Sequence, residues 1–234
     1  MNNTFGNRLS SESKRVLIYE NAELQKKARL CVPLETLSTQ AQEHCANNSS
    51  IDLKDAVLIE LIHWFKNDFF KWFNAPVCIH CNQDMINNGA ANPSPDDLKH
   101  GAQRVELYKC RLCHSVERFP RYNDPEKLLT TRTGRCGEWA NVFTLICRSL
   151  GYDSRYVMDW SDHVWTEVYS EKQKKWLHCD ACEAAIDKPL LYVAGWGKKL
   201  NYVIAFSKDE VQDVTWRYTT NHLEVFTTKS IPNR

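Results

Sequence analysis

Two Cys-x-x-Cys pairs constrain the fold of this chain more than any other feature. Cys78 and Cys81 form the first pair, Cys110 and Cys113 form the second, and residues 82–109 lie between them. Each pair presents two thiolates on one short turn, and four thiolates complete the tetrahedral shell that Zn²⁺ prefers. The spacer is longer than is usual in such sites, but a longer loop adds little closure entropy. The spacing therefore predicts one structural zinc ion held by all four cysteines.

Two histidines offer alternative ligands at the same place. His80 lies between Cys78 and Cys81, and His114 follows Cys113 directly. Two separate redox pairs or buried free thiols are the other interpretations of the four cysteines. A closed four-cysteine site leaves no open position for a substrate, so we expect the chemistry of the protein to lie elsewhere.

The remaining composition indicates a globular protein in a reducing compartment. The chain has 234 residues with 30 Lys+Arg against 29 Asp+Glu, a formal net charge of +1 that argues against a uniformly basic nucleic-acid binder. Residues 1–15 are polar, which predicts no signal peptide, and apolar runs fall far short of the ~20 residues of a membrane helix. We expect a cytoplasmic location, with the nucleus as a second one, and thiols used for metal binding or catalysis rather than disulfides.

Hydrophobic periodicity predicts helices first and a meander of strands after them. The spacing of apolar residues predicts three helices, at 13–30, at 53–73 with Asp52 as N-cap, and from Cys136 to Leu150. The stretch 82–101 is polar and is expected to be a loop. Strands are expected at 154–160, 163–169, 175–180, 200–206 and 211–218. Helices followed by an antiparallel meander define the α+β class.

One of the remaining cysteines lies where a nucleophile is expected. Cys136 stands between Gly134 and Gly137 at a helix start, where the helix dipole favours a thiolate and glycines leave room for a substrate. A thiolate nucleophile needs a general base and a group that orients this base. His163 opens one predicted strand and Asp180 closes the next, so antiparallel pairing brings them together. The pattern predicts a triad of Cys136, His163 and Asp180.

Other assignments of the same roles stay open. His178 is a rival base and Asp162 a rival orienting acid. Each member of the triad, taken alone, is more often a structural residue than a catalytic one. If the triad is correct, the Cys136 sulfur lies within about 4 Å of one His163 nitrogen, and the other nitrogen faces Asp180.

Several motifs in one order resemble the transglutaminase-like superfamily and, more narrowly, the cytoplasmic peptide:N-glycanases in their compact fungal-type form. The matching runs cover roughly residues 53–218 and are Phe69–Trp72, both Cys pairs, Arg118–Pro125, Gly134–Asn141, Arg155–Val157, Asp162–Glu167, Trp176–Asp180 and Gly195–Phe206. The resemblance implies a papain/transglutaminase-like core, in which the helix bearing the cysteine packs on an antiparallel sheet. The domains expected are an N-terminal helical segment at 1–50, a helix packing on the core at 51–76, a zinc-binding subdomain at 77–118, the catalytic core at 119–220 and a tail at 221–234.

The resemblance also implies an activity and its partners. Members of this family hydrolyse the amide between a protein Asn and the first GlcNAc of an N-glycan through a Cys thioester, on denatured glycoproteins in ER-associated degradation. Cys136 would be the nucleophile, with His163 as acid and base. Compact members bind a ubiquitin-receptor and DNA-repair adaptor linked to the proteasome through terminal helices. The chain ends soon after Tyr218, so we expect the C-terminal partner helix to be missing. We expect a monomer.

Similarity to the family further implies a set of sugar contacts. Indole faces stack on pyranose rings and carboxylates accept hydroxyl hydrogen bonds, which suits contacts with the two core GlcNAc residues. The residues that match are Trp72, Trp176, Glu183 and Trp196. Packing roles for the same indoles stay open. Three further residues are expected to form a supporting group that braces the strand hairpin: Arg155, Trp165 and Glu167. The alternative functions are a related thiol enzyme, either a transglutaminase or a cysteine protease, and a non-catalytic adaptor with the same fold.

Overall fold

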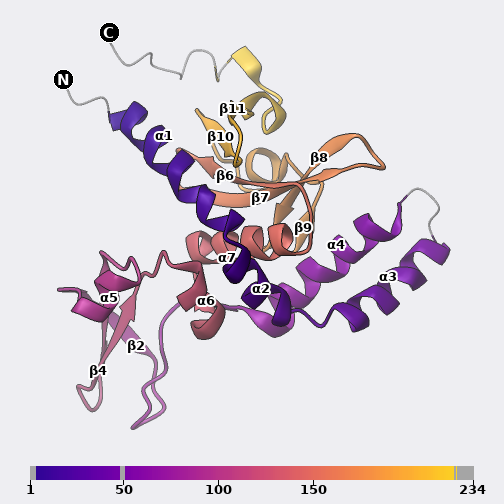
Figure 1. Cartoon of the computed structure of the whole chain (residues 1–234). Coiled ribbons are helices and arrows are strands. Elements are labelled where there is room, and N and C mark those ends of the chain that lie inside the picture. The colour runs from indigo at the N-terminus through magenta and orange to yellow at the C-terminus, as the bar shows by residue number, and fades with distance from the viewer. Residues whose placement is uncertain (1–3, 48–50, 224, 226–234) are drawn as a thin grey trace.

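A six-stranded antiparallel sheet with one long helix against it forms the centre of the computed structural model, which describes residues 4–47, 51–223 and 225 (Figure 1). The strand order is β11-β10-β6-β7-β8-β9, and the helix is α7. The bounds are α7 Cys136–Ser149, β6 Ser154–Asp159, β7 His163–Ser170, β8 Lys175–Asp180, β9 Ala185–Ile186, β10 Val203–Phe206 and β11 Val211–Asp213. The expected α+β class and the helix on an antiparallel sheet are confirmed. Most of the expected tail at 221–234 lies outside the described residues.

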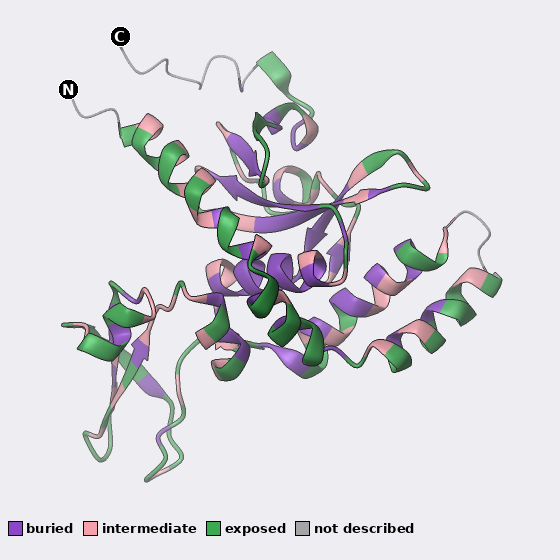
Figure 2. Cartoon of the chain, in the orientation of Figure 1, coloured by how far each residue is buried: buried purple, intermediate pink, exposed green. Residues whose placement is uncertain are grey.

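The sheet has two buried faces because its strands alternate their side chains between them. On one face Thr166 of β7 shares a 2.8 Å hydrogen bond with Thr144 of α7. On the other face Trp165 packs against Tyr192 and Tyr218 from the C-terminal part of the chain. Figure 2 shows α7 and the central strands as mostly buried. Residues at the start of β7 are therefore enclosed from both sides.

The N-terminal region is helical (Figure 1). The bounds are α1 Thr4–Arg15, a 3₁₀ turn at Val16–Glu20, α2 Ala22–Leu30, α3 Leu34–Asn47 and α4 Leu53–Trp64. The helix α2 and the 3₁₀ turn before it pack on α7, while α3 and α4 pack on each other and extend to one side. The single helix predicted over 13–30 was wrong, because Asn21 is extended and its side chain accepts the Leu24 N–H at 2.9 Å to begin a new helix. The sequence analysis also missed α3, whose first turn bonds to the carbonyl of Pro33.

The second predicted helix is shorter than expected. Asp52 is its N-cap and accepts the Asp55 N–H at 2.8 Å, as predicted. The α-helix ends at Trp64, not near residue 73, and a wider turn over Phe65–Phe69 closes with a bond from the Phe70 N–H to the Phe65 carbonyl. This turn lets buried aromatic rings pack on α7. The chain then forms β1, Lys71–Trp72, which pairs in parallel with β5, Thr133–Gly134.

A smaller three-stranded sheet stands beside the core, at the lower left of Figure 1. Its strands are β2 Met85–Ala91, β3 Val105–Cys110 and β4 Val116–Pro120. The helix α5, Pro95–Lys99, connects β2 to β3, and α6, Pro125–Thr131, follows β4. The predicted loop at 82–101 was therefore wrong. β2 is polar and mostly exposed, so it has no buried alternation, and only its backbone pairing with β3 makes it a strand.

Two further strands are shorter than predicted. The run 200–206 forms a strand only from Val203, and the run 211–218 only to Asp213. The Thr215 hydroxyl accepts the Val203 N–H at 2.8 Å, and a 3₁₀ turn over Thr215–Arg217 begins there. A side chain therefore takes the place of the next bond in the ladder. No helix of the described residues is long and apolar enough to cross a membrane.

The expected supporting group lies inside this core. Arg155 and Glu167 face each other across β6 and β7, and their side chains, both buried, form an ion pair with a 2.6 Å Nε–Oε2 distance. Tyr218 donates a 2.6 Å hydrogen bond to the same carboxylate and accepts one from the indole N–H of Trp165 at 2.8 Å. The group therefore ties the C-terminal segment to the sheet.

We predict that Glu167→Gln lowers the free energy of unfolding by about 3–5 kcal/mol, because it leaves the buried Arg155 without its charged partner. Urea denaturation followed by circular dichroism measures this loss. The matched control is Glu210→Gln, since exposed Glu210 lies 3.4 Å from the same guanidinium and should cost less than about 1 kcal/mol. Equal losses in the two variants would contradict the prediction.

Candidate active site and metal centre

His163 and Asp180 lie together at the edge of the larger sheet. His163 Nε2 and Asp180 Oδ2 are 2.7 Å apart, and both side chains are buried. The β7–β8 register pairs Glu167 with His178, which brings the start of β7 beside the end of β8, as the sequence analysis expected. Since Asp180 occupies Nε2, the other ring nitrogen is left for the thiol.

Cys136, the first residue of α7, lies close enough to the same imidazole to raise its pKa. Burial alone would lower the pKa of His163, but its hydrogen bonds with Asp180 and Cys136 raise that pKa to about 9. Burial likewise disfavours the charge of Asp180, yet its bond to His163 holds the pKa of this carboxyl below its usual range. At neutral pH the geometry therefore supports an imidazolium between two groups that favour its charge.

Asp180 accepts further hydrogen bonds that the sequence analysis missed. Tyr192 donates to Oδ2 at 2.8 Å, and the Cys182 N–H donates to Oδ1 at 2.9 Å. Because the Tyr192 proton points to Asp180, its oxygen accepts from His178 Nε2, 2.6 Å away. No sequence signal marks Tyr192, since it lies in a turn between the last strands. These bonds fix the carboxylate that orients His163.

The two rival residues do not take the catalytic positions. His178 is buried against Tyr192, its Nδ1 has no partner among the described residues, and burial lowers its pKa to about 4. It is therefore neutral and bonded away from Cys136. Asp162 lies in the β6–β7 turn with a φ of 86°, and the carboxylate that contacts His163 is that of Asp180.

A cleft lies beside the start of α7. Its volume is about 430 Å³, and it is lined by Lys66, Asn67, Phe70, Lys71, Trp72, Trp139, Cys182 and Glu183. The exposed ring of Trp72 stands on β1, next to the β5 turn that leads into Cys136. Two of the four predicted sugar contacts, Trp72 and Glu183, thus line one cleft.

The other two predicted sugar contacts lie elsewhere. Half-exposed Trp196 stands over His163, with ring centroids 5.1 Å apart. Trp176 lies toward the far end of β8, where the Arg155 guanidinium stacks on its ring at 4.0 Å. Trp196 can therefore contact a substrate bound to the triad, whereas Trp176 supports the buried Arg155–Glu167 pair. The sugar-binding roles of all four residues stay predictions.

The four predicted ligand cysteines come together at one end of the smaller sheet, in turns beside β2 and β4 and at the end of β3. Their sulfur atoms lie within 4.8 Å of one another, and His80 and His114 are not in the cluster. Cys78 is 3.4 Å from Cys113, and Cys81 is 3.2 Å from Cys110. Bonds of about 2.3 Å in a tetrahedron place sulfur atoms about 3.8 Å apart, so the donor set fits a single metal ion.

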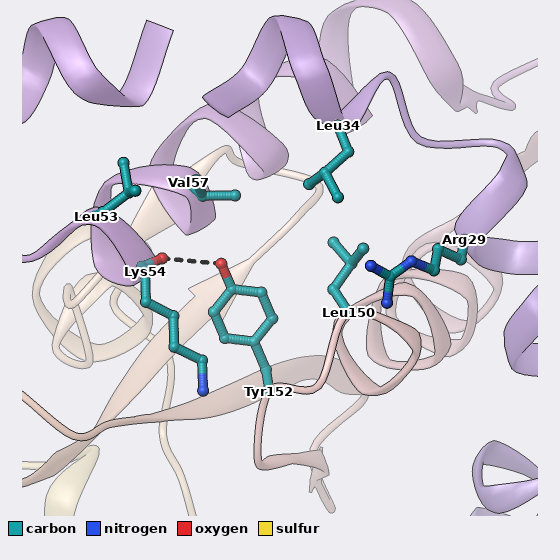
Figure 3. A pocket seen from close by; sticks show the side chains of 7 residues that line it. All are labelled: Arg29, Leu34, Leu53, Lys54, Val57, Leu150 and Tyr152. Atoms are coloured by element: carbon teal, nitrogen blue, oxygen red, sulfur yellow. Dashed lines mark hydrogen bonds between the residues drawn. The ribbon is translucent and has the colours of Figure 1, made fainter. Parts of the chain in front are cut away.

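A second hollow lies away from the triad, where α2, α4 and the end of α7 meet (Figure 3). Its volume is about 350 Å³, and its lining residues are Arg29, Leu34, Leu53, Lys54, Val57, Leu150 and Tyr152. The Tyr152 hydroxyl donates to the Lys54 carbonyl at 2.8 Å, which ties α4 to the end of α7.

The fold and the thiol–imidazole–carboxylate site define a class of protein. The model of the transglutaminase-like superfamily matches residues 84–181, and the Rad4 transglutaminase-like domain matches 155–233. A crystal structure of Rad4-Rad23 bound to a 6-4 photoproduct UV lesion covers 88% of the chain with a TM-score of 0.52 and 16% identity, which shows the fold alone. The part of the chain from residue 84 to residue 233 is therefore similar to transglutaminase-like domains.

The chain is also similar to curated proteins of one name, peptide-N(4)-(N-acetyl-beta-glucosaminyl)asparagine amidase. The Homo sapiens protein is 55% identical over 224 residues, 93% of this chain and 34% of the relative. The Arabidopsis thaliana protein is 48% identical over 235 residues, 98% of this chain and 32% of the relative. The chain therefore spans about a third of the length of these relatives.

We predict that Cys110→Ser abolishes stoichiometric metal binding and unfolds the smaller sheet, because three thiolates leave the tetrahedral shell incomplete. Metal analysis of the purified protein measures the bound ion, and circular dichroism reports the loss of structure. Cys45→Ser is the control, since Cys45 lies in α3, outside the cluster. Full metal content in Cys110→Ser would contradict the assignment.

We predict that NMR titration of the imidazole nitrogens gives a pKa of about 9 for His163 and about 4 for His178. The raised pKa of His163 stabilises the fold below about pH 6.5, and this contribution is lost as the pH rises through 9. The lowered pKa of His178 has the opposite sign, so its contribution is lost as the pH falls from about 6.5 through 4.

Two variants separate the cause of the His163 shift. Asp180→Asn removes the charged partner and should bring the pKa of His163 down toward its ordinary value. Asp162→Asn, one residue from His163 in a turn that Asn tolerates, should leave it raised. A His163 pKa that is the same in Asp180→Asn as in the unmodified protein would overturn the assignment.

Proposed function

We propose that this chain is the catalytic part of a peptide-N4-(N-acetyl-beta-glucosaminyl)asparagine amidase, which removes N-linked glycans from denatured glycoproteins. The observation that supports this most is the meeting of Cys136, His163 and Asp180 beside an indole-lined cleft. The high identity to amidases of this name points to the same substrate class.

The proposed reaction follows from the site. The Cys136 thiolate attacks the side-chain carbonyl carbon of a glycosylated Asn, and the charged His163 gives its proton to the departing glycosylamine as the C–N bond breaks. Neutral His163 then takes a proton from water, which attacks the thioester. The C–S bond breaks as water adds, and the products are Asp on the peptide and the free glycosylamine, with the Cys136 thiolate and the charged His163 restored. Asp180 keeps the imidazole oriented in both steps.

The negative charge on the attacked carbonyl oxygen needs donors. The first backbone N–H groups of α7 have no partners within the helix, so the Cys136 N–H is the first candidate. The indole N–H groups of Trp139 and Trp165 already donate, to the Gly134 carbonyl and to Tyr218. Removing one such donor typically raises the barrier by about 3 kcal/mol.

The finer assignments belong to the same proposal. We assign zinc to the four-cysteine cluster, with a structural role, because the thiolate set is complete and closed. We assign the protein to the cytoplasm, with the nucleus as a second location, where reduced thiols persist. A ubiquitin-receptor and DNA-repair adaptor linked to the proteasome is the proposed partner. The likeness of the fold to Rad4 is compatible with that link.

We predict that Cys136→Ala abolishes glycan release from a denatured N-glycoprotein, because no other group replaces the thiolate. Mass spectrometry of the peptide product, which should carry Asp where the glycosylated Asn stood, measures the reaction. Cys31→Ala is the control, since this thiol is also half-buried but lies outside the cleft.

Parallel assays on the unmodified protein separate the related thiol enzymes. Incorporation of an amine into glutamine would indicate a transglutaminase, and backbone cleavage a cysteine protease. Glycan release by Cys136→Ala at the unmodified rate would disprove the mechanism. A folded, unmodified protein without any of these activities would favour an adaptor.

A further inference from the structure

A ring of four charged side chains joins the smaller sheet to the first turn of α7. Its members are Glu106, Arg121, Arg135 and Glu138. We propose that Glu106 is a positioning residue for Cys136: it holds the start of α7 through two arginines and thereby sets the reactivity of the thiol from the metal-binding subdomain. This inference rests on the proposed role of Cys136 as the nucleophile.

Glu106 binds both arginines at once. Its carboxylate accepts a bidentate pair of hydrogen bonds from the Arg135 guanidinium, with Nη1–Oε1 at 3.0 Å and Nη2–Oε2 at 2.7 Å. Arg121 Nη1 donates to the same Oε1 at 3.2 Å. Tyr108 adds a 2.9 Å bond to Oε2, and exposed Arg104 approaches Oε1 at 3.3 Å. Paired bonds of this kind fix the plane of a guanidinium as well as its distance.

Glu138 closes the ring on the helix side. Arg121 donates to both of its oxygens, from Nε at 2.6 Å and from Nη2 at 2.9 Å. The backbone N–H of Arg135 donates to Glu138 Oε2 at 3.0 Å. Cys136 lies between Arg135, the N-cap of α7, and Glu138, so the ring holds the backbone on both sides of it.

The surroundings leave the ring one arrangement. A Cβ atom on Gly134 would lie only 2.4 Å from the Glu138 Cβ, so the backbone there needs glycine to let the carboxylate come close. Arg135 Nε also donates to the Phe73 carbonyl at 3.3 Å, and the Phe73 N–H donates to the Gly134 carbonyl at 2.8 Å. The residues before Cys136 are therefore bound on the β1 side too.

Burial makes the loss of a glutamate from the ring more disruptive than the loss of an arginine. The side chains of Glu106 and Glu138 are buried, while the arginines are partly exposed. Burial would raise the pKa of Glu106, but hydrogen bonds from Arg135 and Tyr108 hold it at about 2. The carboxylate is thus charged at any working pH. The Arg121 guanidinium also bonds to Glu138, whereas Glu106 is the acid of the ring that binds the Arg135 guanidinium.

The sign of the effect separates positioning from simple electrostatics. Neutralising Glu106 removes a negative charge near Cys136. The loss of Coulomb repulsion alone would favour the thiolate and speed its reactions. Loss of position acts in the opposite direction, because it moves the sulfur away from the helix N-terminus and from His163.

We predict that Glu106→Gln slows alkylation of Cys136 by iodoacetamide at pH 7 by at least about tenfold, the scale expected from a small misplacement of a reacting group. The metal-loaded protein is used, and the rate is read by mass spectrometry on the tryptic peptide 136–148. This peptide also contains Cys147, which is buried and serves as an internal reference. The assay needs no glycoprotein, so its outcome is independent of the proposed amidase activity.

Asp97→Asn is the matched control. Asp97 is a buried acid of the same subdomain and pairs with Arg118 at 2.8 Å, away from the ring. It should keep the alkylation rate of Cys136 at that of the unmodified protein. Metal content and thermal unfolding of both variants report whether the subdomain remains intact.

A double-mutant cycle completes the test. If Glu106 acts through Arg121, Glu106→Gln with Arg121→Gln slows alkylation no more than Glu106→Gln alone. Should Glu106→Gln fail to fold, Arg121→Gln alone carries the same expectation, since Arg121 is less buried. A rate that is unchanged or faster in the folded variant, or equally slowed in Asp97→Asn, would overturn the proposal.

Discussion

The contact between the first turn of α7 and the start of β7 is the constraint on which the rest of the structure depends. Cys136 can reach His163 only if the helix lies along one face of the sheet and begins level with the end of β8. The buried Thr144–Thr166 bond fixes this packing farther along α7. Short pairing of β1 with β5 and the charged ring around Arg135 hold the approach to the helix. The larger sheet, the β1–β5 pair and the charged ring thus meet at one thiol.

The electrostatics of the site follow from its burial. A buried carboxylate is costly unless hydrogen bonds replace its water, and Asp180 has donors from a ring nitrogen, a phenol and the backbone. Tyr192 donates to the same carboxylate oxygen that His163 contacts, and the neutral His178 bonds to the Tyr192 hydroxyl. An acid held charged in this way can keep His163 protonated at neutral pH, which a leaving amine requires.

Particular elements show how far pattern reading could go. The predicted helix at Cys136 and the hairpin from His163 to Asp180 were placed correctly, because a helical period of apolar residues marks the helix and a short turn between two strand-like runs marks the hairpin. The break at Asn21 and the strand β2 were missed, since one rests on a local side-chain cap and the other on backbone pairing alone. Tyr192 and Glu106 carry no local signal, because their roles arise from residues distant in the chain.

The sequence by itself determined the class of the fold, the four clustered cysteines and the three residues proposed for catalysis, since spacing and residue type carry that information. Only the tertiary structure decided that His163 rather than His178 meets the thiol, that Trp72 and Glu183 share a cleft while Trp176 stacks on Arg155, and that Glu106 reaches the start of α7. These outcomes depend on strand register and on contacts between separate elements, which no local pattern encodes.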